Sequence, residues 1–363
     1  MMMILLALGG AAAAAPTWEG LASYTFEDYR KDFGKAYATE AEEAERRAIF
    51  EARLSSIRAH NAAGLNSYKK GVNRLTDRRD DERAALNGRD KVLAAAKGRD
   101  GPVYVSEGSD ALPETFDWRG KGILTAIKDQ GMCGSCWAFA STETIESHAA
   151  LDSGKLVELS PQHLVSCAAN VYDCGGTGGC GGSIAELAFE YVQTHGMATE
   201  WTYPYTAGLD GATGECRYNA SSPIPKAATL DGYVRVPSND EAAVLTALVK
   251  EGPLAVNVDA NGWHDYESGV FDGCATGGEN VDIDHVVQLV GYGKDYLLVR
   301  NSWDTTWGED GFIRLARTTK CGVDSTPLDG TGCAGGNATQ HVCGACGVLF
   351  DASYPLNARV LST

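Results

Sequence analysis

The chain has 363 residues, of which 44% are hydrophobic and 22% are charged, and these are ordinary proportions for a folded globular protein. No apolar run approaches the roughly 20 residues that would span a bilayer. Residues 17–110 carry 17 basic and 17 acidic side chains, whereas residues 111–363 carry 14 and 31 and so hold the whole formal net charge of −17. This acidic surplus argues against nucleic acid or an anionic membrane as a partner.

The first residues predict export from the cytosol. Residues 1–15 combine a short apolar stretch with a run of alanines, which predicts a secretory signal peptide cleaved near Ala15; a buried N-terminal helix is the alternative. All 11 cysteines lie after residue 130. An odd number of cysteines in an exported chain predicts disulfides and one remaining, reactive thiol.

A helical stretch and a linker are expected next. Residues 21–66 are predicted to be helical, because Phe50, Leu54 and Ile57 recur at helical spacing. Residues 87–110 are polar, rich in glycine and interrupted by a proline. They predict an exposed linker of the kind that proteases cut.

From Leu112 onward the sequence predicts an α+β fold in two halves. Helices are expected from Cys136 and over residues 183–195. Beyond residue 226, alternating or β-branched runs predict antiparallel strands over 254–259, 286–290, 296–300 and 311–317, with a helix over 239–250. A helical half followed by a strand half predicts two lobes with a cleft between them.

The most informative segment is residues 130–140, which contains Cys133 and Cys136. Small and apolar residues after Cys136 predict a helix whose first turn holds this thiol, and a helix N-terminus favours the thiolate. A cysteine nucleophile needs that help, because an ordinary thiol is only a few per cent ionised at neutral pH. The alternative is a zinc-stabilised binding module built with Cys343 and Cys346, although about 210 residues separate the two pairs.

This segment resembles the active-site segment of papain-like cysteine proteases, and the motifs around His285 and Asn301 follow in the family's order. The resemblance implies a papain-like fold, with a helical lobe, an antiparallel β-barrel-like lobe and the active site between them. Cys136 would be the nucleophile and His285 the general acid and base. Asn301 would orient the imidazole under the cover of Trp303, and Gln130 would contribute to the oxyanion hole.

The same resemblance implies which side chains contact the substrate. The pocket for the second residue before the scissile bond would be lined by Ser183, Ile184, Ala185, Asn257, Ile283 and Val286, with Asp351 at its floor. Trp307 would lie on the leaving-group side. Apolar walls predict Leu, Val or Phe in the substrate, and the carboxylate of Asp351 predicts that Arg is accepted as well.

The resemblance also implies three disulfides, which are Cys133–Cys180, Cys167–Cys216 and Cys274–Cys346. With Cys136 set aside, the cysteines that remain are Cys174, Cys321, Cys333 and Cys343, and the sequence does not choose among their three pairings. The last three lie in a glycine-rich stretch, residues 318–345. This stretch predicts a surface insertion held by its own disulfides.

The first third of the chain resembles the inhibitory propeptide of cathepsin L-like enzymes. The matching positions are Glu42, Arg46, Phe50, Arg53, Ile57 and Asn61, followed by Gly71, Asn73, Leu75 and Asp77, with Arg53 replacing an Asn and Leu75 a Phe. The resemblance implies that residues 16–110 are an inhibitory helical propeptide with its linker and that residues 111–363 are the peptidase domain. Protonation of carboxylates such as Asp77 would release the propeptide in acid.

These features predict a cysteine endopeptidase that is made as an inactive zymogen and cuts peptide bonds through a thioester. A papain-fold amidase or transpeptidase is the alternative. We expect a monomer with protein and peptide substrates, its own propeptide as inhibitor, and neither a cofactor nor a metal. The chain would follow the secretory pathway to a lysosome or vacuole, or out of the cell. Asn219 and Asn337 lie in glycosylation sequons, and the other histidines are expected to be structural or exposed.

Overall fold

The computed structural model describes residues 15–64, 66–87, 101–105, 111–218, 223–274, 280–333 and 335–361. The helices, with 3₁₀ helices marked η, are η1 (Trp18–Ser23), α1 (Phe26–Asp32), α2 (Glu40–Ala62), α3 (Asp80–Ala84), η2 (Ala85–Asn87), α4 (Cys136–Ser153), α5 (Pro161–Cys167), α6 (Ala185–His195), α7 (Glu241–Lys250), η3 (Pro327–Asp329) and η4 (Ala345–Gly347). The strands are β1 (Tyr68–Lys70), β2 (Phe116–Asp117), β3 (Ala228–Thr229), β4 (Gly232–Arg235), β5 (Leu254–Val258), β6 (Tyr266–Phe271), β7 (His285–Tyr292), β8 (Tyr296–Arg300), β9 (Phe312–Ala316), β10 (Cys321–Asp324), β11 (Gln340–Cys343), β12 (Ala352–Leu356) and β13 (Arg359–Val360).

Three sequence expectations fall largely outside these ranges. The proposed signal peptide lies outside them except for Ala15, the linker over 87–110 lies outside them except for residues 87 and 101–105, and Asn219 lies in a gap. Asn337 is described and exposed. Within the described ranges, none of the helices is both long and apolar enough to cross a membrane.

The N-terminal segment, residues 15–87, is divided into several elements and does not form the single helix predicted over 21–66. Gly34 follows α1 with φ of +60°, a left-handed conformation that costs glycine little and ends the helix. Thr39 then starts α2 by accepting a hydrogen bond from a backbone N–H of the first turn. The buried side chains of α2 are Phe50, Leu54 and Ile57, as the helical spacing predicted.

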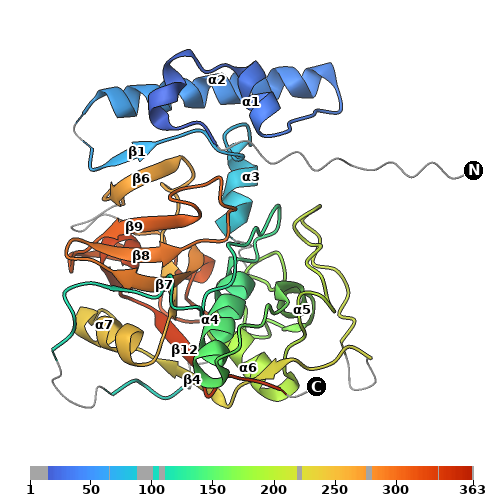
Figure 1. Cartoon of the computed structure of the whole chain (residues 1–363), viewed down its shortest axis with the longest axis vertical. Helices are drawn as coiled ribbons and strands as arrows, with labels where there is room; N and C mark the ends of the chain where they lie inside the picture. The colour runs from blue at the N-terminus through green and yellow to red at the C-terminus, as the bar shows by residue number, and fades with distance from the viewer. Residues whose placement is uncertain are drawn as a thin grey trace, which may run out of the picture.

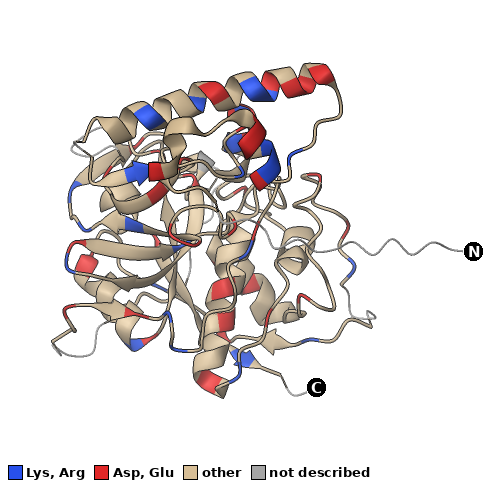
Figure 2. Cartoon of the chain, turned by 45° about the horizontal axis from the view of Figure 1, so that its top comes forward, with Lys and Arg blue, Asp and Glu red and all other residues tan. Residues whose placement is uncertain are grey.

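Helices α1 and α2 form a layer above the sheet, and α3 descends from that layer toward the start of α4 (Figure 1). Figure 2 shows basic and acidic residues mixed along α2, where Arg47 pairs with Glu27 of α1 at 2.6 Å. Strand β1 pairs antiparallel with β6. The N-terminal segment therefore adds an edge strand to the sheet of the main body.

Helices α4, α5 and α6 form the helical lobe. Helix α4 begins at Cys136, as predicted, and 14 of its 18 residues are buried. A helix that is buried on nearly every side packs between other elements. It contacts α5 and α6 within its own lobe and β7 in the sheet, so α4 is shared by both lobes (Figure 1).

The sheet lobe is built on strands in the order β1-β6-β9-β8-β7-β5-β12-β4, with β2 beside β7. Strand β8 has the predicted bounds, and β5, β7 and β9 differ from prediction by one or two residues at their ends. The four predicted strands, β5, β7, β8 and β9, pair antiparallel as expected, whereas β6, which the sequence did not predict, runs parallel to β9. The two lobes have separate hydrophobic cores, and the α+β fold class is confirmed.

Five disulfides join ten of the 11 cysteines and leave Cys136 as a thiol. The three pairs that the family resemblance implied are present. The other four cysteines pair as Cys174–Cys333 and Cys321–Cys343. Cys174 lies between α5 and α6, so the insertion at 318–345 is held by one disulfide of its own and by a second that leaves it.

Candidate active site

Cys136 is the first residue of α4 and is 2% exposed. The first-turn N–H groups of a helix have no partners within the helix, and together with the helix dipole they favour an anion at this position. The Sγ atom of Cys136 lies 3.8 Å from the backbone oxygen of Asn87 in the N-terminal segment. The thiol is thus placed where a thiolate is stabilised, and the N-terminal segment covers it.

His285 and Asn301 come together from adjacent strands. His285 begins β7, Asn301 directly follows β8, and the two strands pair antiparallel. The imidazole Nε2–H donates to the side-chain oxygen of Asn301 over 2.9 Å. That oxygen also accepts from the backbone N–H of Ser302 at 2.8 Å, which fixes its direction. An imidazole held in this way presents Nδ1 away from Asn301.

A group of tryptophans surrounds this pair. The ring of Trp303 lies 5.0 Å from that of His285 and is fully buried, as expected for a cover over the His285–Asn301 contact. Trp307 was expected to meet the leaving group, but it is also fully buried. Its indole N–H donates to the backbone oxygen of Trp263 at 3.0 Å, and its ring packs edge-on against Trp303. Its described contacts belong to the core of the sheet lobe, and its expected position on the leaving-group side stays a prediction.

Gln130 lies six positions before Cys136 in the chain and is fully buried. Its Oε1 atom accepts a 2.8 Å hydrogen bond from the hydroxyl of Ser302. This contact turns the amide so that Nε2 donates to the backbone oxygen of Leu86 at 2.7 Å and to that of Cys133 at 3.0 Å. This role of Ser302 was not predicted from the sequence, although Ser302 stands between the predicted site residues Asn301 and Trp303.

An ion pair and hydrogen bonds hold the N-terminal segment against the sheet lobe next to this site. Arg83 is 8% exposed and pairs with Asp265 at 2.7 Å. His264 Nε2 lies 3.2 Å from the backbone oxygen of Arg83, and the Asn73 amide donates to the backbone oxygen of His264 at 2.8 Å. A second cation, Arg74, pairs with Asp129, whose chain position lies directly before Gln130. Polar contacts that the sequence did not reveal therefore hold the segment over the active site.

The expectation that Asp77 belongs to this contact is wrong. Asp77 is 3% exposed and accepts hydrogen bonds from the hydroxyls of Tyr29 and Tyr37 at 2.7 and 2.9 Å and from Lys35 at 2.8 Å. All of these partners belong to the N-terminal segment. Burial alone would raise the pKa of Asp77, but Lys35 and the two hydroxyls outweigh it and hold the pKa below its usual value. Asp77 therefore stabilises the fold of the segment itself.

The residues expected to line the substrate pocket are all buried. They are Ser183, Ile184, Ala185, Asn257, Ile283, Val286 and Asp351. The Asn257 amide donates to the carboxylate of Asp351 at 2.8 Å, and these two residues come from β5 and from the residue directly before β12. Ile184 directly precedes α6 in the helical lobe and Ile283 lies two residues before β7 of the sheet lobe, so the residues expected to form the apolar walls come from different lobes.

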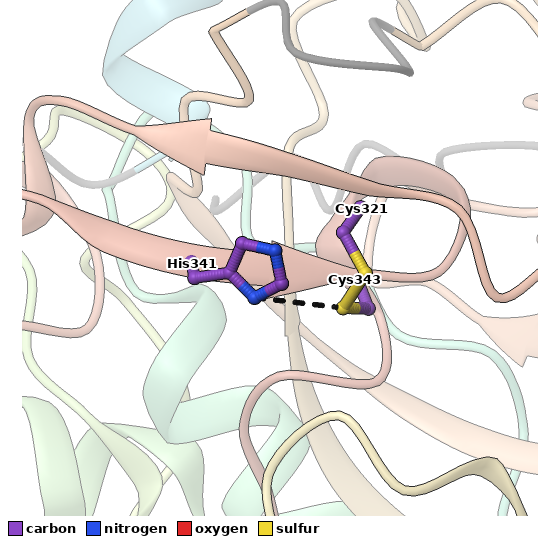
Figure 3. A group of neighbouring side chains, drawn as sticks. All are labelled: Cys321, His341 and Cys343. Atoms are coloured by element: carbon purple, nitrogen blue, oxygen red, sulfur yellow. Dashed lines mark hydrogen bonds between the residues drawn. A yellow bond between two sulfur atoms is a disulfide. The ribbon is translucent and has the colours of Figure 1, made fainter.

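The alternative of a zinc module is contradicted by the disulfides. Of the four cysteines that it requires, only Cys136 keeps its thiol. In the described part of the chain, the side chains close enough to hold a metal ion are Cys321, His341 and Cys343. Figure 3 shows that Cys321 and Cys343 are bonded to each other, with His341 Nδ1 3.9 Å from the sulfur of Cys343. Since the thiolate is the ligand form of cysteine, this group does not offer a metal site.

Comparisons with known proteins agree with this geometry. A family model for papain family cysteine proteases matches residues 112–331, and one for the cathepsin propeptide inhibitor domain (I29) matches residues 26–82. Cathepsin S of Bos taurus is 37% identical over 312 residues, which cover 82% of this chain and 89% of that protein. Cathepsin L of Sarcophaga peregrina is 36% identical over 313 residues, covering 81% and 88%. The structure of digestive procathepsin L 3 from Tenebrio molitor matches with a TM-score of 0.71 at 31% identity, covering 91% and 97%.

The chain belongs to the papain family of cysteine proteases. It is a cysteine endopeptidase made as a zymogen, and its N-terminal segment is a cathepsin-type propeptide that inhibits it. Both family resemblances are therefore confirmed. Five disulfides are typical of proteins that fold in the oxidising secretory pathway.

Proposed function

We propose that Cys136 attacks the peptide carbonyl as a thiolate, paired with His285 as an imidazolium. His285 protonates the leaving amine and later deprotonates the water that cleaves the thioester. Asn301 keeps the imidazole in place. The Gln130 side-chain amide and the backbone N–H of Cys136 bind the oxyanion, a contact worth about 3 kcal/mol in comparable enzymes.

One observation supports these roles above the others. Two consecutive backbone carbonyls of the propeptide meet the proposed machinery, since that of Leu86 accepts from Gln130 and that of Asn87 lies 3.8 Å from the Cys136 sulfur. The Gln130 amide and the Cys136 sulfur are the two groups that the carbonyl of a scissile peptide bond would contact in a substrate complex. The propeptide thus inhibits by occupying the donor and the nucleophile with its own peptide groups.

An epoxide that alkylates thiols tests the assignment. After acid activation we expect the label on Cys136, located by mass spectrometry of a digest, and complete loss of peptide hydrolysis. The neutral precursor should react at least tenfold more slowly, because the thiol is buried beneath the propeptide. Hydrolysis that survives full labelling of Cys136 would refute the assignment. An added amine nucleophile distinguishes hydrolysis from transpeptidation by its products.

The substrate pocket has an acidic floor in our proposal. We propose that Asp351 lies behind the apolar side chains of Ile184 and Ile283, so that a substrate Leu packs on these walls while the guanidinium of a substrate Arg reaches the carboxylate. The contact of Asn257 with the Asp351 carboxylate orients this group.

This proposal predicts dual specificity at the second residue before the scissile bond. The parent enzyme should cleave matched fluorogenic peptides with Leu or Arg at that position. Asp351→Asn, which keeps the shape and the contact with Asn257, should lower kcat/KM for the Arg peptide at least tenfold and that for the Leu peptide less than threefold. Equal losses for both peptides, or no cleavage of the Arg peptide by the parent, would contradict it.

The remaining proposals concern processing and destination. We propose a signal peptide over residues 1–15, a propeptide with its linker over 16–110 and a monomeric mature domain starting close to Leu112. The acidic mature domain suits an acidic lysosome or vacuole, and secretion from the cell is the alternative destination.

A further inference from the structure

The insertion at 318–345 is rooted in the sheet lobe. Strands β10 and β11 form an antiparallel hairpin, closed near its base by the disulfide Cys321–Cys343 (Figure 3). The backbone oxygen of Val323 accepts from the N–H of Val281 at 2.9 Å, two residues before Ile283. Val342 packs with Val281 and Ile283 in a small buried cluster. The hairpin thus continues the wall that carries one side of the proposed substrate pocket.

Between the two hairpin strands the chain leaves the sheet lobe and reaches the helical lobe. We call residues 326–333 the strap. Its last residue, Cys333, is bonded to Cys174, which lies 159 positions earlier between α5 and α6. The N–H of Gly175 donates to the backbone oxygen of Gly332 at 3.0 Å. A covalent bond and a backbone hydrogen bond therefore anchor the strap on the helical lobe.

Both walls of the proposed pocket lie directly against the strap. A Cβ atom on Gly330 would overlap the backbone oxygen of Ile283, and one on Gly175 would overlap the backbone oxygen of Gly330. The same Cβ on Gly175 would lie 3.1 Å from the side chain of Ile184. Glycine at these positions lets three chain segments from two lobes approach to backbone contact.

The strap is packed as part of the structure and is not an exposed loop. Gly330 and Gly332 are buried, and Thr331 is 1% exposed with its hydroxyl donating to Gln340 at 2.7 Å. At the first residue of the strap, the Thr326 hydroxyl donates to the carboxylate of Asp282 at 2.6 Å. The expectation of a surface insertion is wrong for these residues, because they fill the space between the lobes.

We infer that the strap limits how far a substrate extends on the N-terminal side of the scissile bond. This inference rests on the proposed pocket, because Ile184 and Ile283 mark the second residue before the bond. A longer peptide lying between the lobes has to pass the place where Gly330 bridges Gly175 and Ile283. The disulfide to Cys174 keeps the strap from swinging aside. The endopeptidase therefore prefers bonds that have few residues before them.

A series of fluorogenic peptides tests the inference with the activated enzyme. Each peptide has Leu as the second residue before the cleaved bond, preceded by a blocking group alone or by one to four further residues. In the parent enzyme kcat/KM should fall at least tenfold from the shortest to the longest peptide. Cys174→Ser with Cys333→Ser should remove most of that fall while changing the rate on the shortest peptide less than threefold.

Two further variants serve as controls for this experiment. Cys321→Ser with Cys343→Ser breaks the disulfide that stays within the sheet lobe, so it should keep the dependence on length. If the first double variant does not fold, Cys174→Ser with residues 325–339 replaced by Asn-Gly removes the strap altogether, because Asp324 and Gln340 are paired and a two-residue turn closes such a hairpin. The kcat/KM of this variant should not depend on the length of the peptide.

The possible outcomes distinguish a failure of the inference about the strap from a failure of the proposed function. Equal rates on all lengths in the parent, or a dependence on length that persists without the strap, would overturn the inference while leaving the pocket in place. Failure to cleave even the shortest peptide would count against the pocket. In that case the rate at which epoxides of increasing peptide length alkylate Cys136 reports on the strap without turnover.

Discussion

Replacing Cys136 with Ala is expected to lower peptide hydrolysis by at least about 10⁴-fold, because the substitution removes the nucleophile that we propose. His285→Ala should be nearly as severe. Asn301→Ala should cost about 10²-fold, since both reacting groups remain but the 2.9 Å contact that holds the imidazole is lost. The measurement is kcat/KM on a blocked dipeptide substrate after removal of the propeptide by an added protease.

The controls for this series are folding and a distant histidine. The Cys136→Ala precursor should unfold at the parent's temperature, because only one sulfur atom is removed. It should also stay at full length in acid, whereas N-terminal sequencing of the parent should find a new start near Leu112. His195→Ala changes an exposed residue at the end of α6 and should keep full activity. Hydrolysis above about a percent of the parent rate in Cys136→Ala would rule out this thiol as the nucleophile.

The second large effect is expected from His264, at the contact between propeptide and enzyme. Burial and the nearby charge of Arg83 lower the pKa of His264 to about 4, while Asp265 acts in the opposite direction. Its ring stacks on Trp303, and its Nε2 meets the backbone oxygen of Arg83. When the propeptide leaves, the ring loses Arg83, and we expect its pKa to return toward 6.5.

The sign of the pH effect follows from this difference. The complex favours neutral His264, so the released enzyme binds the proton more readily. The contribution of His264 to the stability of the complex between propeptide and enzyme is constant above pH 6.5. As the pH falls from about 6.5 to about 4, the complex loses up to roughly 3 kcal/mol of stability. Asp265 behaves differently. Burial would raise its pKa, but Arg83 outweighs burial and keeps the pKa below the usual value, so this pair survives at pH 4 to 5.

His264→Gln should therefore resist activation by acid. The glutamine amide can still donate to the backbone oxygen of Arg83 but does not titrate in this range, so the midpoint of propeptide release should move about one pH unit lower. Asp265→Asn is the matched control, because it weakens the contact with Arg83 at neutral and acidic pH alike. Release is followed by the appearance of epoxide-reactive Cys136. An unchanged midpoint in His264→Gln would assign the acid trigger to another group.

Most of the active site could be predicted from the sequence because its signals are local. A thiol followed by small and apolar residues predicts a helix that starts at Cys136, and alternating runs predict the strands that bring His285 and Asn301 together. The prediction of one helix over 21–66 failed because Gly34 and Thr39 interrupt it, and these breaks are weaker signals than hydrophobic spacing. Asp77 was misplaced because a motif residue says nothing about which surface its carboxylate faces.

By itself the sequence determined the fold class, the protease family, the catalytic residues that we propose, and the existence of a propeptide and an insertion. Only the tertiary structure decided how Cys174, Cys321, Cys333 and Cys343 pair, and that one of these bonds carries the strap across to the helical lobe. The entropy of closing a chain loop grows only with the logarithm of its length, so spacing along the chain hardly distinguishes one pairing from another. Packing decides instead, because Gly330 fits between Gly175 and Ile283 only when both lobes are assembled.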